Sequence, residues 1–150
     1  MKAVLIGMIA SMFSWQGWVL NNIHPSDLEM LFRVVESEAT GGTIEQKKNV
    51  MSCVLARMRS PEFPNTVEGV IFEKGQFAVI SDKRYYNVKV TESTKKAVIE
   101  VLLCGMTTDC LFFCTPTCQS AETGWFSTLE IQFNDKMHIY TYGNKKEGGP

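Results

Sequence analysis

Apolar residues recur at helical spacing early in the chain. They lie three or four residues apart, which places their side chains on one face of an α-helix. These residues are Leu28, Leu31, Phe32 and Val35. Ser26 and Glu29 have the spacing of a capping box at the start of this run, and the pair Gly41-Gly42 follows its end. We therefore predict an amphipathic helix over residues 26–40.

The pattern predicts two further helices. One begins at Thr43, with Gln46 completing a second capping box, and ends by Ser60-Pro61. The other is capped by Thr91 and ends at Gly105. Their inward side chains are expected to be Val50, Cys53, Val54, Met58, Ala97, Val98, Val101 and Leu102. Between the two helices we expect a stiff loop, a short apolar turn at 67–72 and an irregular stretch at 75–87.

The last third of the chain has the alternation of β-strands. One strand is predicted at 111–113, and segments 125–133 and 137–142 are predicted to form a hairpin around the turn at 134–136. Helices first and a small antiparallel sheet last indicate the α+β class.

An apolar segment at 1–24 precedes the predicted catalytic domain at 25–143, and a polar, flexible tail is expected at 144–150. Lys2 followed by an apolar run is the outline of an export signal, although no small-x-small cleavage site precedes Trp18. Three interpretations stay open for this segment: a signal or membrane anchor, a helix packed on the domain, and an interfacial helix.

Charge and composition exclude some functions. The 150 residues include 15 Lys and Arg against 16 Asp and Glu, a formal net charge of -1, so the chain is not a strongly basic nucleic-acid binder. The 45% hydrophobic residues are typical of a globular protein. Only two histidines, His24 and His138, are present, and we expect neither a metal site nor a cofactor.

Glu38 is the most informative titratable residue. It lies seven positions after Leu31, about 20° away around a helix, and therefore on the apolar face. Glu29 and Glu36 are predicted on the opposite, hydrated face. Burial and the negative end of the helix dipole would both raise the pKa of Glu38, which suits a general acid. The alternative is a structural glutamate bonded to Arg57 or to backbone amides.

A series of motifs resembles, in order and spacing, the bacterial and phage family of cell wall hydrolases that includes the spore-cortex-lytic enzymes. The segment Arg33-Val34-Val35-Glu36-Ser37-Glu38-Ala39-Thr40-Gly41-Gly42 is similar to the family signature R-x-V-x-A-E-A-x-G-E. Further matches lie at 54–57, 59–67, 75–77, 111–113 with Pro116, 125–126 and 138–140. The resemblance covers about residues 27–142.

The resemblance implies a lysozyme-like fold and cleavage of peptidoglycan glycan strands by a lytic transglycosylase, with Glu38 as the catalytic acid and base. Protonated Glu38 would donate to the oxygen between N-acetylmuramic acid and N-acetylglucosamine, and its carboxylate would then accept a proton from the muramyl 6-hydroxyl. The closing of a 1,6-anhydro ring needs no second enzymic carboxylate. We expect an exported or cell-wall-associated monomer, bacterial or phage-encoded, with possible membrane association through its N-terminal segment.

Several residues are candidates for substrate binding: Gln76, Trp125, Tyr85, Tyr86, His138 and Tyr140. The amide of Gln76 both donates and accepts hydrogen bonds, and the flat face of Trp125 suits a sugar ring. Tyr85 and Tyr86 lie in the predicted irregular stretch and could line a groove. His138 and Tyr140 share one face of the last strand. Each has a purely structural alternative.

The sequence departs from the family at three places. Ala56 replaces the usual asparagine, Gly42 replaces glutamate, and Cys114-Thr115-Pro116 stands where Tyr-Asn-Pro is common. The lost amides leave two other functions open: a non-catalytic peptidoglycan-binding relative, and a hydrolytic muramidase or amidase.

Five cysteines are an odd number, so at least one thiol is free or pairs between chains. Cys104, Cys110, Cys114 and Cys118 lack the C-x-x-C spacing of structural zinc sites. A disulfide among Cys110, Cys114 and Cys118 is open if the protein is exported. Cys53 is expected to be a small buried hydrophobe.

Overall fold

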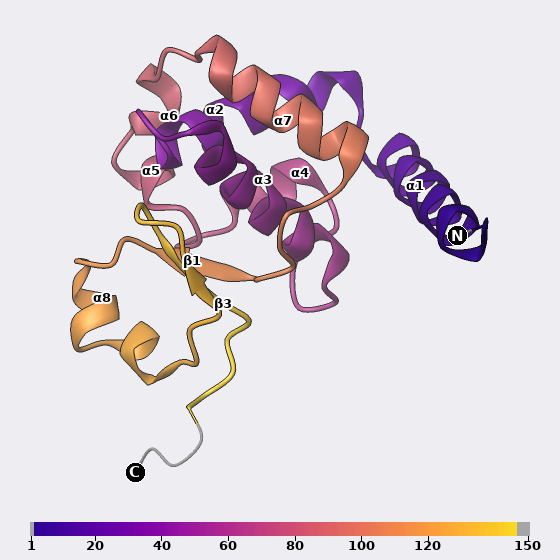
Figure 1. The fold of residues 1–150 in the computed structure, drawn as a ribbon. Helices are drawn as coiled ribbons and strands as arrows, with labels where there is room; N and C mark the ends of the chain where they lie inside the picture. Colours follow the sequence, from indigo (N-terminus) through magenta and orange to yellow (C-terminus); the bar gives the residue numbers. More distant parts are fainter. Residues whose placement is uncertain (1, 147–150) are drawn as a thin grey trace.

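Three helices, α2 (Leu28–Glu38), α3 (Ile44–Arg59) and α7 (Glu92–Cys104), pack against one another in the computed structural model, which describes residues 2–146 (Figure 1). The short helix α4 (Val67–Phe72) closes the core against α2 and α3. Core side chains at 0% exposure come from all four helices and include Leu31, Val54, Ile71 and Val101. The predicted three-helix core is therefore confirmed.

The helix starts test the capping predictions. Thr43 and Gln46 form the predicted capping box: Thr43 N–H donates to Gln46 Oε1 at 2.9 Å, and Gln46 N–H donates to Thr43 Oγ1 at 3.2 Å. The box predicted at Ser26 is wrong. A 3₁₀ turn, η1 (Pro25–Asp27), comes first, and the Asp27 carboxylate accepts the His24 N–H at 2.8 Å. Proline at the first position of this turn moves the helical start one residue earlier.

Thr91 occupies the predicted N-cap position of α7, but the predicted capping bond is absent. The Thr91 hydroxyl instead donates to Glu36 Oε2 at 2.6 Å, and its backbone N–H donates to the same oxygen at 2.9 Å. This contact ties α7 to α2.

Glu36 is buried, at 2% exposure, so the prediction that it faces water is wrong. The reason is that α2 is covered on two sides, by α3 and by α7, and the second contact is polar. Besides Thr91, the Glu36 carboxylate accepts a hydrogen bond from Thr94, and it lies 3.6 Å from Lys47 Nζ. Glu29 does face solvent, and it pairs with Arg33 at 2.7 Å.

The segment between α4 and α7 is irregular, as predicted, apart from two single-turn helices. These are α5 (Ala78–Ser81) and α6 (Arg84–Asn87). Lys83, between them, has a φ of 70°, a left-handed conformation that turns the chain sharply. The turn brings Arg84 back towards the end of α2.

A three-stranded antiparallel sheet of order β1-β3-β2 lies beside the helices, formed by β1 (Phe112–Cys114), β2 (Phe133–Asn134) and β3 (Ile139–Thr141). The β2–β3 hairpin around 134–136 is confirmed, with Phe133 opposite Tyr140. The α+β class is likewise confirmed. Two short helices, α8 (Gln119–Glu122) and η2 (Trp125–Thr128), connect β1 to β2 (Figure 1).

The long strand predicted at 125–133 is wrong. Residues 125–128 form the 3₁₀ turn η2, and strand pairing begins only at Phe133. Ser127 Oγ donates to Gly124 O at 2.6 Å and Thr128 Oγ1 donates to Trp125 O at 2.7 Å. Such local side-chain bonds stabilise a turn at the expense of an extended strand.

The N-terminal helix α1 (Lys2–Asn22) projects away from the domain (Figure 1). Residues 2–14 are all exposed, and α1 is the one helix among residues 2–146 long and apolar enough to cross a membrane, by length and composition. At its domain end, Trp15 Nε1 donates to Val101 O at 3.1 Å, and the Arg59 guanidinium lies over both Trp15 and Trp18. Only this last part of α1 packs on the domain.

Of the predicted tail, residues 144–146 run beside 128–130. Glu130 N–H donates to Asn144 O at 2.8 Å, and Lys146 N–H donates to Thr128 O at 3.0 Å. The rest of the predicted tail, residues 147–150, lies outside the described residues.

Candidate active site

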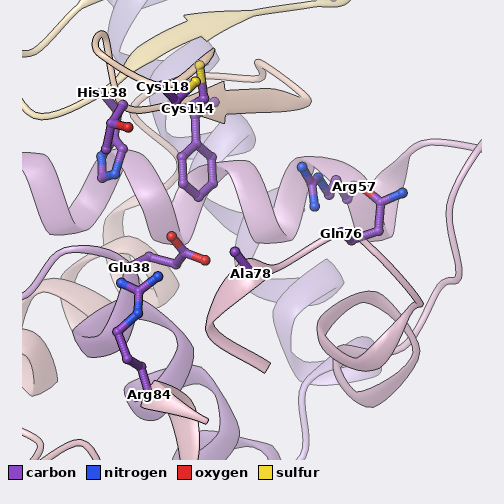
Figure 2. A pocket seen from close by; sticks show the side chains of 10 residues that line it. Glu38, Arg57, Gln76, Ala78, Arg84, Cys114, Cys118 and His138 are labelled. Carbon is purple, nitrogen blue, oxygen red and sulfur yellow. The ribbon is translucent and has the colours of Figure 1, made fainter. Parts of the chain in front are cut away.

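A cavity of about 260 Å³ lies between the C-terminal end of α2, helix α3 and the β1–α8 connection. Figure 2 shows the Glu38 carboxyl and Arg84 at one end of the view, and Arg57 and Gln76 at the other. The lining residues are Glu38, Arg57, Gln76, Ala78, Arg84, Phe113, Cys114, Thr115, Cys118 and His138. Segments far apart in the sequence therefore meet around one carboxyl group.

Glu38 is the last residue of α2, and burial raises its pKa from the ordinary 4.5 to about 7. Arg84 and Arg57 act in the opposite direction through their positive charges, and Asp82 adds to the increase. None of the ion pairs formed among residues 2–146 includes Glu38. A substantial fraction of Glu38 is therefore protonated at neutral pH, as an acid catalyst requires.

Arg84 stands beside Glu38 without neutralising it. Its guanidinium pairs with Asp82 at 2.8 Å, and its Nη1 donates to the Ser37 carbonyl oxygen at 3.2 Å. These contacts hold the cation at the C-terminal end of α2, where it also offsets the negative end of the helix dipole. Arg84 therefore limits how far burial can raise the pKa of Glu38.

Arg57 forms the opposite end of the cavity and is 3% exposed. Its Nε donates to the Leu111 carbonyl oxygen at 2.7 Å. Its guanidinium lies 4.8–5.6 Å from the ring centroids of Phe63, Phe77 and Phe112, within the range of cation–π attraction. The alternative raised for Glu38, an ion pair with Arg57, is not what the structure shows.

Two of the predicted substrate-binding residues line the cavity. Gln76 lies next to Arg57 and lines the cavity at the end away from Glu38 (Figure 2). His138 is 2% exposed and contacts the Phe113 ring edge-on at 4.9 Å between centroids. Burial lowers the pKa of His138 below its ordinary 6.5, which favours the neutral imidazole at neutral pH.

The other four predicted residues lie outside this lining. Tyr140 and Tyr85 are in the core, at 0% and 5% exposure, whereas Tyr86 and Trp125 are each 50% exposed. Trp125 packs edge-on against Phe112, with 5.1 Å between ring centroids. Binding roles for these four residues stay predictions, and only the two exposed aromatics are free to meet an extended ligand.

Sequence reasoning did not single out Arg84, Ala78 or Phe113 as site residues. Phe113 was within a matched motif, but Arg84 and Ala78 lie in the stretch predicted to be irregular. The signal that could have found Arg84 is its place between Gln76 and Tyr85, two residues already assigned to the site. Among residues 2–146, no group of three or more His, Cys, Asp or Glu side chains could hold a metal ion.

The cavity and the helix–sheet arrangement agree with the comparisons with known proteins. The sequence profile described as Cell Wall Hydrolase matches residues 41–141, about two thirds of the chain, and this chain belongs to that family. The matched range begins three residues after Glu38, so the family match itself does not include Glu38.

Spore cortex-lytic enzymes are among the similar curated proteins. The enzyme of Bacillus subtilis is 34% identical over 51% of this chain, and that of Bacillus cereus is 33% identical over 56%. The aligned parts are 25% and 32% of those proteins, so the chain corresponds to about a quarter to a third of their length.

Two solved catalytic domains have the same fold. The catalytic domain of the Bacillus cereus SleB protein superposes with a TM-score of 0.71 at 28% identity, covering 81% of this chain and 93% of that domain. The catalytic domain of the germination-specific lytic transglycosylase SleB from Bacillus anthracis gives 0.70 at 29% identity, covering 81% and 98%. The predicted lysozyme-like fold is confirmed.

Proposed function

We propose that this protein cleaves peptidoglycan glycan strands as a lytic transglycosylase, with Glu38 as both acid and base. The observation that carries the proposal is a carboxyl group with a pKa of about 7, lining a cavity and free of an ion pair within the described residues. The similarity to a germination-specific lytic transglycosylase domain over 81% of this chain supports it.

The reaction needs one group that first gives and then takes a proton. Protonated Glu38 donates to the glycosidic oxygen as the bond to C1 of N-acetylmuramic acid breaks. The muramyl 6-hydroxyl then attacks C1, and its proton passes to the Glu38 carboxylate. Atoms balance without water, because the hydroxyl belongs to the substrate. The regenerated acid is ready for the next cleavage.

The cavity gives each neighbour of Glu38 a defined task. Arg84, held by Asp82, stabilises the carboxylate formed halfway through the reaction. The Gln76 amide is placed to bond an N-acetyl group or ring hydroxyls at the far end of the cavity. His138 lines the same cavity and packs against Phe113, and we assign it a role in shaping the site around Glu38.

We further propose that α1 places the domain on the outer side of a cytoplasmic membrane, as an anchor or export segment. A helix that is apolar all round and not buried in protein is typical of a membrane-inserted segment. Its 21 residues span about 31 Å, close to the thickness of the hydrocarbon core. The substrate lies on that outer side.

Digestion of purified sacculi tests the reaction. The wild-type protein should release muropeptides with 1,6-anhydro ends, each lighter by one water than a hydrolytic product, as measured by mass spectrometry. Glu38→Gln should fold and release none, whereas Glu29→Gln on the exposed face of α2 should act like the wild type. Reducing-end products would instead indicate a hydrolytic muramidase, and sacculus binding without products would indicate a non-catalytic relative.

A further inference from the structure

Two thiols form part of the cavity wall near Glu38. Cys114 ends β1 and Cys118 precedes α8, and both line the cavity (Figure 2). Figure 2 shows their sulfur atoms close together, and the two thiols are near enough for Cys118 to raise the pKa of Cys114. The protein therefore holds two reactive groups together at a wall of its own candidate active site.

The backbone between the two cysteines is already folded back. Cys118 N–H donates to the Thr115 carbonyl oxygen at 3.1 Å, which closes a turn, and the Cys118 sulfur accepts the Ala121 N–H at 3.3 Å. On the other side, Cys114 pairs with Ile139 of β3. The backbone at both cysteines and the sulfur of Cys118 are thus held in position by surrounding structure, so little ordering of the chain is needed for the two thiols to react with each other.

We propose that Cys114 and Cys118 are a disulfide-forming pair that closes the cavity wall when the protein reaches an oxidising compartment. All five cysteines are free thiols in the structure. The compartment follows from the proposed function, because peptidoglycan lies outside the cytoplasm, where disulfides persist. The pairing itself rests only on the geometry of the two sulfurs.

The oxidant is a disulfide, either a small molecule such as oxidised glutathione or a thiol–disulfide oxidoreductase. One thiolate attacks the oxidant, forming a mixed disulfide and releasing one thiol. The second protein thiol, on the same wall of the cavity, attacks the mixed disulfide at the protein sulfur and releases the other thiol. The protein loses two electrons and two protons, and the oxidant gains them.

The remaining cysteines are poorer partners for this pair. Cys53 and Cys110 are both at 0% exposure, whereas Cys114 and Cys118 are partly exposed, so of these four thiols an oxidant in solution reaches only the cavity pair. Cys104 is exposed at the end of α7, away from the cavity, and is a risk only for cross-linking between molecules. Replacing Cys104 by serine removes that complication.

Formation of the Cys114–Cys118 disulfide would make the cavity wall more rigid. The new ring encloses Thr115, which also lines the cavity, so three wall residues would lose freedom together. A wall held in its binding shape requires less ordering when a glycan strand enters, which lowers the KM rather than changing the acid chemistry at Glu38.

Peptide mapping tests the pairing on the Cys104→Ser protein, incubated with oxidised glutathione and then alkylated without reduction. We expect a mass loss of two hydrogens, a Cys114–Cys118 cross-link after digestion, and alkylation of Cys53 and Cys110 only after unfolding. Alkylation of both Cys114 and Cys118 after oxidation, or a Cys53–Cys110 cross-link in their place, would overturn the proposal.

Kinetics on sacculi test the consequence. Dithiothreitol should raise the KM of the oxidised protein at least twofold with little change in kcat, and this response should vanish in the Cys114→Ser, Cys118→Ser double variant. An equal dithiothreitol response in the double variant would refute the role in the wall. Peptide mapping needs no turnover, so the pairing can be established even if the protein proves not to cleave glycan.

Discussion

Glu36 and Glu38 lie two residues apart on α2 and have opposite electrostatic environments. Burial would raise the pKa of Glu36, but hydrogen bonds from Thr91 and Thr94 and the charge of Lys47 outweigh it and hold that pKa below its ordinary value. Glu38 has no such set of donors, and its pKa rises to about 7. One carboxyl group therefore holds helices together, while its neighbour keeps a proton close to neutral pH.

The first prediction concerns the pH dependence of activity. Because Glu38 must be protonated to act as an acid, kcat/KM on sacculi should be nearly constant below pH 7 and fall tenfold per pH unit above it. Initial rates of muropeptide release between pH 5 and 9 measure this, over the range in which the fold is intact by circular dichroism. A rate that still rises through pH 8 would contradict an acid role for Glu38.

The second prediction concerns stability and follows from the same carboxyl group. The folded protein keeps a proton on Glu38 up to about pH 7, whereas the unfolded chain releases it near pH 4.5. Between these two pH values only the unfolded chain gains from losing the proton, so the free energy of unfolding falls as pH rises. Glu38→Gln should therefore gain stability relative to wild type from pH 4.5 to 7, by at most about 3 kcal/mol. Urea unfolding at pH 4, 6 and 8 measures the difference, and a constant difference would argue against the raised pKa.

The third prediction uses the charges next to Glu38. Arg84 lowers the pKa of Glu38 and Asp82 raises it, so Arg84→Met should move the alkaline limb of the pH–rate profile upward and Asp82→Asn should move it downward. Both side chains are exposed, and solvent screening should keep each movement to about one pH unit or less. If the alkaline limb moved in the same direction in both variants, the two substitutions would be acting through a change of structure rather than through charge.

The sequence predicted the burial of Glu38 and its raised pKa, because a helical carboxyl group seven residues from Leu31 lies on the apolar face. The same helical spacing misplaced Glu36, since the pattern marks only apolar contacts, and α2 also meets α7 through a polar one. Arg84 was missed for a related reason: its position depends on the left-handed turn at Lys83, which hydrophobic periodicity does not encode. The strand predicted to begin at Trp125 does not form there, because the hydroxyl groups of Ser127 and Thr128 donate hydrogen bonds to nearby backbone carbonyls and stabilise a turn.

The fourth prediction tests the structural role of Glu36. Its carboxylate and the Lys47 ammonium are each 2% exposed, and removing one partner leaves the other charge buried without compensation. Glu36→Gln should therefore lower the free energy of unfolding by about 3–5 kcal/mol, and Glu36→Gln with Lys47→Met should lower it less. Chemical denaturation gives both values. Equal losses in the single and double variants would mean that the two charges do not interact.

The fifth prediction concerns the part of α1 that projects from the domain. Residues 2–14 are exposed, so deleting them should leave the melting temperature unchanged within about 2 °C, because no core contact is lost. The same deletion should abolish co-sedimentation with phospholipid vesicles. The matched variant is Trp15→Ala, which keeps the apolar segment but removes the indole bonds to Val101 and Leu102. It should still bind vesicles while its melting temperature falls. If the deleted protein bound vesicles as well as the full chain does, the membrane contact would have to come from the domain itself.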